Sequence, residues 1–235
     1  VFRCNAEPAV GGGHIMRCLA LAKKLSTSGW RCAFAVNPGA KLVVPELEHS
    51  GFEVVIVAEN ATAEDLGKHF REGVELLLVD HYGLDTNFES SCRSWAKTIM
   101  VIDDLADRPH DCDLLLDTTP GRAGESYRGL VPDRCRLLLG PIYAILRDEF
   151  AMLRGDALAR REMKTTIDRV LVSFGLTDPA GATAKAVLGV LESGLRTTLE
   201  VVLSPKAPNY ERVASLACHN DDIRLFEYVY DMSKL

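Results

Sequence analysis

Short apolar segments recur along almost the whole chain, and most are followed by a segment with helical periodicity. Several are apolar at nearly every position, as in Leu76–Val79 and Val170–Val172. Continuous apolar runs of this kind are typical of strands buried on both faces of a parallel sheet. We therefore predict strands over Phe2–Ala6, Arg31–Val36, Glu53–Val57, Leu76–Asp80, Ile99–Asp103, Leu114–Asp117, Leu137–Gly140, Arg169–Phe174, Leu199–Leu203 and Ile223–Phe226.

Between these strands the apolar residues take the spacing of amphipathic helices. One helical face consists of Ile15, Leu19, Ala22 and Leu25. A second consists of Ala184, Val187, Leu188 and Leu191. Gly29 and Gly194 follow these faces, at positions where glycine commonly ends a helix. The alternation of strand and helix predicts right-handed βαβ units and an α/β fold with parallel sheets.

The most charged segment, Phe150–Asp168, is followed by a fresh strand–helix unit. We predict two Rossmann-like domains, over residues 1–150 and 169–235, joined by a connector at 151–168. The second has only about three predicted strands, fewer than a complete domain of this type. The chain starts at Val1 inside a predicted strand and stops at Leu235 in what reads as the first turn of a helix. We therefore expect the second domain to be truncated.

The composition is that of a globular protein, with 47% hydrophobic and 26% charged residues among 235, and it excludes intrinsic disorder. No apolar run approaches the ~20 residues that cross a bilayer, and no pattern of an export signal is visible. The formal net charge of −6 gives no general attraction to nucleic acid or to an anionic membrane. We expect neither partner, and the sequence leaves the oligomeric state open, a monomer being compatible with it.

Seven cysteines are scattered along the chain without a Cys-x-x-Cys pair. Zinc sites and disulfide frameworks need clustered cysteines, so neither is predicted. We interpret them as reduced thiols packed as small apolar side chains in a cytoplasmic protein.

The first candidate for chemistry is a glycine turn, Gly11–Gly13, between the first strand and a helix that begins near His14. Glycines allow close approach of a ligand to the backbone, and a helix N-terminus favours an anion. His14 stands in the first helical turn and can act there as acid or base. The spacing matches neither a dinucleotide fingerprint nor a P-loop. An incidental histidine after a structural turn is the alternative.

Polar residues also follow the fourth and fifth strands. Asp80, His81 and Tyr82 follow one, and Asp103 and Asp104 follow the other. The carboxyl ends of parallel strands meet at one edge of a sheet, where α/β proteins bind ligands. The paired carboxylates can bind sugar hydroxyls or cap a turn, and without further ligands at metal spacing we do not predict a metal site. Asp80 can equally be a helix cap.

Two later segments also place residues that can bind phosphate after a glycine that follows a predicted strand. After the turn at Gly140, Tyr143 and Arg147 are predicted one helical turn apart, with Arg147 able to pair with phosphate or to form a surface salt bridge. Gly175 and Thr177 follow the first strand of the second domain and can hold a phosphate. Two such glycine turns suggest a ligand gripped between two domains.

These motifs, in this order, resemble the PseG family of UDP-2,4-diacetamido-2,4,6-trideoxy-β-L-altropyranose hydrolases of pseudaminic acid biosynthesis. The resemblance spans essentially the whole chain. The matching segments are Arg3-x-Asn5 with Val10–Ala22, Asp80–Tyr82, Ile102–Leu105, His110–Asp113, Gly140–Arg147 and Phe174–Asp178.

The resemblance implies a GT-B-like fold, as in glycosyltransferases such as MurG, with UDP bound mainly by the second domain. It implies hydrolysis of the sugar–UDP bond at the anomeric carbon, with His14 as the base and Tyr82 near the sugar, and no metal or other cofactor. The substrate is then a UDP-activated diacetamido sugar. Residues expected to contact it are Arg3, Asn5, Gly11, Gly13, Arg17, Asp80, Asp103, Tyr143, Arg147, Gly175, Thr177 and Asp178.

The chain departs from the family pattern in three places. Asn5 stands where the family usually has Asp, and Leu176 stands where it has a second Gly. The family also continues beyond residue 235 into a glycine-rich segment with a uridine-binding Glu. Two other functions stay open: a glycosyltransferase of the same architecture, in which an acceptor hydroxyl replaces water, and a degenerate fragment that binds a nucleotide sugar without turnover.

Overall fold

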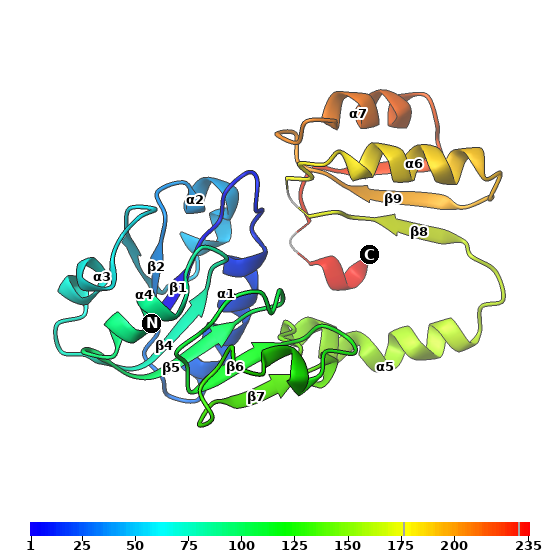
Figure 1. The fold of residues 1–235 in the computed structure, drawn as a ribbon. Helices are drawn as coiled ribbons and strands as arrows, with labels where there is room; N and C mark the ends of the chain where they lie inside the picture. The colour runs from blue at the N-terminus through cyan, green and yellow to red at the C-terminus, as the bar shows by residue number, and fades with distance from the viewer. Residues whose placement is uncertain (176, 230) are drawn as a thin grey trace. The chain divides into compact units, whose positions relative to one another are not determined.

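The computed structural model describes residues 1–175, 177–229 and 231–235 (Figure 1). The chain forms two compact units. Unit 1 comprises Val1–Ala6 and His14–Ile145, and unit 2 comprises Glu7–Gly13 and Leu146–Leu235. Most of the expected connector, residues 151–168, is the helix α5 (Asp148–Glu162), which is part of unit 2.

Unit 1 contains a seven-stranded parallel sheet with the order β3-β2-β1-β4-β5-β6-β7. Its strands are β1 (Phe2–Cys4), β2 (Ala33–Val36), β3 (Glu53–Ile56), β4 (Val74–Asp80), β5 (Ala96–Ile102), β6 (Leu114–Asp117) and β7 (Arg136–Leu139). Each coincides with a strand predicted from the apolar pattern. The strand order reverses between β1 and β4, where Cys4 is paired with Asp80. This reversal is the topological switch point at which α/β sheets bind ligands.

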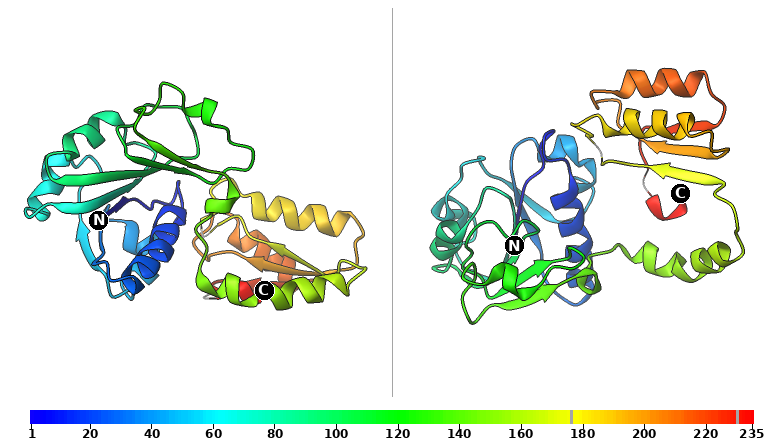
Figure 2. Two further views of the ribbon diagram at one scale, coloured as in Figure 1. Left: turned by 90° about the horizontal axis from the view of Figure 1, so that it is seen from below. Right: turned by 45° about the vertical axis from the view of Figure 1, so that its right-hand side comes forward.

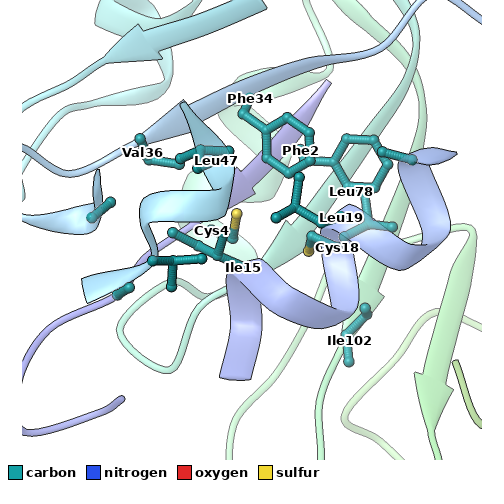
Figure 3. Close-up of a cluster of buried hydrophobic side chains, with 14 of the residues drawn as sticks. Phe2, Cys4, Ile15, Cys18, Leu19, Phe34, Val36, Leu47, Leu78 and Ile102 are labelled. Atoms are coloured by element: carbon teal, nitrogen blue, oxygen red, sulfur yellow. The ribbon is translucent and has the colours of Figure 1, made fainter. Parts of the chain in front are cut away.

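Helices cover both faces of this sheet. They are α1 (Gly13–Thr27), α2 (Ala40–Val43), α3 (Ala63–His69) and α4 (Thr86–Cys92), with short 3₁₀ turns at Pro45–Leu47, Gly124–Tyr127 and Pro141–Tyr143. Leu78 packs with Ile15 and Leu19 of α1 on one face (Figure 3), whereas its neighbours Leu77 and Val79 pack on the other. Because successive strand residues point to opposite faces, this division explains the continuous apolar runs.

Helix α1 starts and ends where the sequence pattern indicates. Gly29 has a φ of 88°, a conformation that glycine adopts without strain. Its N–H donates to the carbonyl of Ser26 at 3.0 Å, and the N–H of Trp30 donates to that of Leu25 at 3.1 Å. This pair of bonds is the Schellman motif, which satisfies carbonyls left open at a helix C-terminus. The helix is thereby fixed with its N-terminal turn at the switch point.

Unit 2 contains a three-stranded parallel sheet with the order β10-β9-β8. Its strands are β8 (Arg169–Val172), β9 (Thr198–Val202) and β10 (Ile223–Phe226), and its other helices are α6 (Ala182–Glu192), α7 (Tyr210–Cys218) and the short turn η4 (Met232–Lys234). Helices α6 and α7 lie on the same face of this sheet (Figure 2) and bury Val187 and Val213 against it. The α/β fold with two parallel sheets is thus confirmed.

Two further properties bear on function. Within the described residues, no helix has both the length and the apolar character that crossing a bilayer requires. All seven cysteines carry free thiols. Those buried in unit 1 are Cys4, Cys18, Cys32, Cys92 and Cys112.

Candidate active site

Polar side chains gather in unit 1 at the carboxyl ends of β1 and β4. Asn5 directly follows β1, His14 and Arg17 lie at the start of α1, and Asp80 is the last residue of β4. Tyr82 follows two residues later. Asn5, His14 and Asp80 are buried, whereas the Tyr82 side chain is 42% exposed. The structure thus brings together five of the residues expected to act on the substrate.

The orientation of His14 is set by Asn5. Nδ1 of the imidazole lies 2.9 Å from Oδ1 of the Asn5 amide. An amide oxygen only accepts hydrogen bonds, so the proton of a neutral imidazole stays on Nδ1. Nε2 then carries the free lone pair. His14 is therefore held in the tautomer that can accept a proton at Nε2.

The main chain directly after Asn5 is held by a residue that follows β2. The side chain of Asn37, one residue beyond β2, accepts from the Ala6 N–H at 3.0 Å and donates to the Ala6 carbonyl at 3.0 Å. This pair of bonds ties the end of β1 to the end of β2. Asn37 was not among the predicted site residues, although its place after a predicted strand puts it at the same edge of the sheet as Asn5.

Asp80 is a buried carboxylate paired with Arg17. Nε and Nη2 of Arg17 donate to the two oxygens of Asp80, both at 2.6 Å. Burial alone would lower the pKa of Arg17, but the hydrogen bonds and charge of Asp80 outweigh it and raise that pKa. Oδ1 of Asp80 also lies 3.9 Å from Nε2 of His14. The carboxylate is thus placed to stabilise a proton on that nitrogen.

Burial lowers the pKa of His14 below its ordinary value of 6.5. The charge of Asp80 opposes this shift, the charge of Arg17 reinforces it, and the charge of Asp104 opposes it again. Because the net effect is a lowered pKa, the imidazole is neutral at neutral pH and free to act as a base.

Tyr82 packs against His14 with its ring at 75° and its centroid 4.7 Å away. Its hydroxyl donates to Oδ2 of Asp104 at 3.5 Å. Burial raises the pKa of Tyr82, and the charge of Asp104 adds to the shift, so the hydroxyl stays protonated. Oδ2 of Asp104 also lies 3.6 Å from Nη1 of Arg17. Asp104 therefore contacts both Tyr82, whose ring packs against the imidazole, and Arg17, whose charge acts on it.

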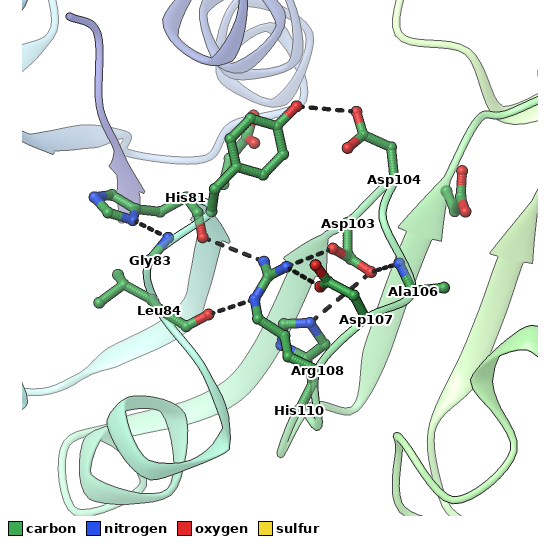
Figure 4. Close-up of polar contacts among 12 residues, drawn as sticks. His81, Gly83, Leu84, Asp103, Asp104, Ala106, Asp107, Arg108 and His110 are labelled. Atoms are coloured by element: carbon green, nitrogen blue, oxygen red, sulfur yellow. Dashed lines mark hydrogen bonds and ion pairs between the residues drawn. The ribbon is translucent and has the colours of Figure 1, made fainter. Parts of the chain in front are cut away.

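Asp103, the expected substrate contact, has both carboxylate oxygens engaged within the protein (Figure 4). It accepts from Nη1 of Arg108 at 3.0 Å and from the N–H of Ala106 at 2.9 Å. It also accepts from the hydroxyl of Tyr127 at 3.1 Å. Asp103 and Asp104 are adjacent in the sequence and were predicted as a pair, but the structure separates their roles. Asp103 stabilises the turn, and Asp104 contacts Tyr82 and Arg17.

Arg3 is fully buried in β1, where its Nη1 donates to the carbonyl of Cys4 at 3.2 Å. It affects a second histidine, His81. Burial, followed by the charge of Arg3, lowers the pKa of His81 to about 4. His81 is accordingly neutral across the physiological range, and its Nδ1 accepts from the N–H of Gly83 at 3.0 Å.

The glycines expected to hold phosphate belong to unit 2. Gly11 has a φ of 84°, and a Cβ there would lie 3.6 Å from the Thr177 hydroxyl oxygen. Gly175 has a φ of 86°, and space is open around it and around Gly13. These positions leave the backbone accessible to a ligand. Leu176, where the family pattern has glycine, lies outside the described residues.

Asp178 caps helix α6. Its two carboxylate oxygens accept from the N–H groups of Ala182 and Thr183, each at 2.9 Å. The side chain is buried and satisfies two of the donors that a helix N-terminus leaves open. This contact gives Asp178 a structural role besides the substrate contact implied by the resemblance.

The predicted helical spacing of Tyr143 and Arg147 is wrong. Tyr143 ends the 3₁₀ turn that follows Gly140, and helix α5 begins only at Asp148. Residues 144–147 are not helical, because the acidic pair Asp148–Glu149 complements a helix N-terminus and starts α5 there. Arg147 directly precedes that start without a side-chain cap hydrogen bond, and its Nε lies 3.1 Å from Oε1 of Glu149.

In the part of the chain that the structure describes, no three histidine, cysteine, aspartate or glutamate side chains form a group that could hold a metal ion. The site described above consists of hydrogen-bonding and titratable groups of unit 1.

No protein-family model matches the chain. It is 27% identical to the UDP-2,4-diacetamido-2,4,6-trideoxy-β-L-altropyranose hydrolase of Campylobacter jejuni, over 100% of this chain and 80% of that protein. It is 24% identical to the uncharacterized protein MJ1062 of Methanocaldococcus jannaschii, over 96% of this chain but 47% of that protein.

Among solved structures, MurG of Acinetobacter baumannii is similar with a TM-score of 0.52 and 13% identity, over 99% of this chain and 69% of that one. At this identity the likeness concerns the fold alone. The resemblance to the PseG family read from the motifs is thus confirmed along the whole chain, on a fold of the GT-B type.

Proposed function

We propose that this protein hydrolyses a UDP-linked 2,4-diacetamido-2,4,6-trideoxy sugar at its anomeric carbon and releases UDP and the free sugar in pseudaminic acid biosynthesis. The full-length similarity to a hydrolase of that name supports the substrate. The observation that carries the chemistry is the contact of His14 with Asn5, which leaves Nε2 of a neutral imidazole as the proton acceptor.

In the proposed reaction a water molecule loses its proton to Nε2 of His14 as its oxygen bonds to the anomeric carbon. The bond from that carbon to the diphosphate oxygen breaks, and its electron pair leaves with UDP. The imidazolium formed in this step lies 3.9 Å from the carboxylate of Asp80. Asp80 thus stabilises charge that is absent before the proton moves, which is the kind of interaction that accelerates a reaction.

The other residues receive binding roles in this proposal. The half-exposed ring of Tyr82, beside His14, contacts the sugar. Unit 2 holds the diphosphate through the open backbone at Gly175 and the hydroxyl of Thr177. Tyr143 and Arg147 contribute a half-exposed ring and a cation to substrate binding. No metal takes part, because His14 activates the water directly. We also propose that the protein acts in the cytoplasm, because its seven cysteines carry free thiols.

A glycosyltransferase is the second candidate, because the GT-B type of fold is compatible with it. In that case an acceptor hydroxyl replaces the water. The two functions differ when a UDP-diacetamido sugar is incubated with the protein and no acceptor. A hydrolase releases UDP and free sugar in equal amounts, measured by ³¹P NMR and chromatography. A transferase leaves the nucleotide sugar intact, and a protein that only binds it gives heat in a UDP titration without turnover.

A further inference from the structure

We infer that Asp104 is a positioning residue for His14: it fixes Tyr82, whose ring packs against the imidazole, and Arg17, which holds the Asp80 carboxylate near Nε2. This inference rests on the proposed function only in treating His14 as the base. The resemblance implies a substrate contact for Asp103 and no separate role for its neighbour Asp104.

Two sets of contacts lead from Asp104 to His14. Oδ2 of Asp104 accepts from the Tyr82 hydroxyl at 3.5 Å, and the Tyr82 ring packs edge-on against the imidazole. The same oxygen lies 3.6 Å from Nη1 of Arg17. The other nitrogens of Arg17 hold the Asp80 carboxylate, 3.9 Å from Nε2 of His14. A single carboxylate thus controls both the packing and the charge around the base.

The main chain at Asp104 is held firmly enough for this role. Its carbonyl accepts from Nη2 of Arg122 at 2.6 Å. Two residues later, Ala106 has a φ of 54°, a left-handed conformation that is unfavourable for alanine. Such a conformation persists only where the surroundings impose it, and here the Ala106 N–H donates to Asp103 (Figure 4). These contacts therefore hold the main chain from which the Asp104 side chain extends.

The charges that face His14 come from three elements. Asp80 at the end of β4 and Asp104 after β5 are negative, Arg17 on α1 is positive, and the neutral groups are Asn5, Tyr82 and His81. Asp104→Asn removes one negative charge and keeps the shape of the side chain. Both the packing of Tyr82 and the proton affinity of His14 should then change.

The test is NMR of wild type and Asp104→Asn. We expect a weaker nuclear Overhauser effect between the Tyr82 and His14 rings, and a lower pKa of His14 in a pH titration. Asp107→Asn is the matched control, because Asp107 is exposed and pairs with Arg108. It should leave both signals unchanged. Unchanged signals in Asp104→Asn, or equal changes in the control, would overturn the inference.

A second variant covers the case in which Asp104→Asn fails to fold. Tyr82→Phe removes the hydroxyl from the other side of the contact and should weaken the same Overhauser effect. Both variants should lower kcat by about 10-fold to 100-fold, as expected when a reacting group is misplaced, with KM little changed. An Overhauser effect and a kcat equal to wild type in Tyr82→Phe would contradict the inference. If wild type itself hydrolyses no UDP-sugar, the proposed function fails, while the NMR results still decide the role of Asp104.

Discussion

Nδ1 of His14 lies 2.9 Å from Oδ1 of Asn5, so the partner of the imidazole is a neutral amide. An amide oxygen selects the same tautomer as a carboxylate would, but it adds no negative charge beside the ring. Burial then dominates, and the pKa of His14 is lowered. The proposed base is therefore already unprotonated at neutral pH, and Asp80 supplies the counter-charge once a proton arrives.

Asn5→Asp should raise the pKa of His14, because a carboxylate 2.9 Å from Nδ1 stabilises the imidazolium. With a raised pKa, the His14 imidazole becomes protonated, and stops acting as a base, at a higher pH as the solution is acidified. The acidic limb of the kcat/KM profile should move up by about one to three pH units. Asn87→Asp, which adds the same charge at an exposed position of α4, is the control and should leave the profile in place. An unmoved limb in Asn5→Asp would contradict the assigned contact.

Arg17→Lys should destabilise unit 1, because lysine cannot donate two parallel hydrogen bonds to the buried Asp80 carboxylate. We expect a loss of about 1–3 kcal/mol in the free energy of unfolding, measured in urea at neutral pH. Arg134→Lys alters an arginine that is 56% exposed and is paired with Asp111 and Asp113, and it should cost less than about 1 kcal/mol. Equal losses in the two variants would show that the Arg17–Asp80 pair has no special weight.

Asp178→Ala should remove the cap of α6 and lower the stability of unit 2 by about 1 kcal/mol. Asp178→Asn keeps an oxygen acceptor and should retain most of that stability. Thermal melting distinguishes the variants, and calorimetry with UDP tests whether the residue also binds ligand. If Asp178→Asn melts like wild type but binds UDP more weakly, the carboxylate contacts the nucleotide as well as the helix.

Activity should persist in excess EDTA. The proposed base is an imidazole activated by its own surroundings, and no metal-binding group of three side chains occurs among the described residues. Initial rates are to be compared before and after chelation and dialysis. A rate that falls on chelation and returns with magnesium or manganese would mean that Asp103 and Asp104 had been interpreted wrongly.

The arrangement of strands was accessible from the sequence because both faces of the large sheet are buried. Leu77, Leu78 and Val79 point alternately into two cores, so the run is apolar throughout and marks β4 clearly. Helix α1 could be predicted equally well, since its apolar face ends at Leu25 and Gly29 marks the helix end shortly after it. The spacing of Tyr143 and Arg147 could not be predicted in the same way. The sequence is compatible with one helix or with a turn followed by α5. The outcome depends on the acidic residues Asp148 and Glu149, which start α5.

The site was predictable by residue type and position but not by contact. Placing Asp80 and Tyr82 at the end of a strand beside the glycine turn required only the rule for parallel sheets. Asn5 and His14 are nine residues apart, and their contact depends on the conformation of the intervening loop. Asp103 and Asp104 lie beyond the end of β5 at Ile102, where strand alternation no longer fixes which side chain turns inward. Only the structure shows that Asp103 belongs to the buried hydrogen-bond network and that Asp104 contacts Tyr82.

Activation of water by His14 for attack on the anomeric carbon of a UDP-sugar can be measured in one experiment. Wild type and His14→Asn are incubated with the UDP-diacetamido sugar in ¹⁸O-labelled water, and the products are followed by ³¹P NMR. We predict release of UDP without label in its β-phosphate, because the bond from carbon to oxygen breaks, and a rate about 10²–10⁴-fold lower in His14→Asn. Label in the β-phosphate, or a His14→Asn rate within threefold of wild type, would contradict the account.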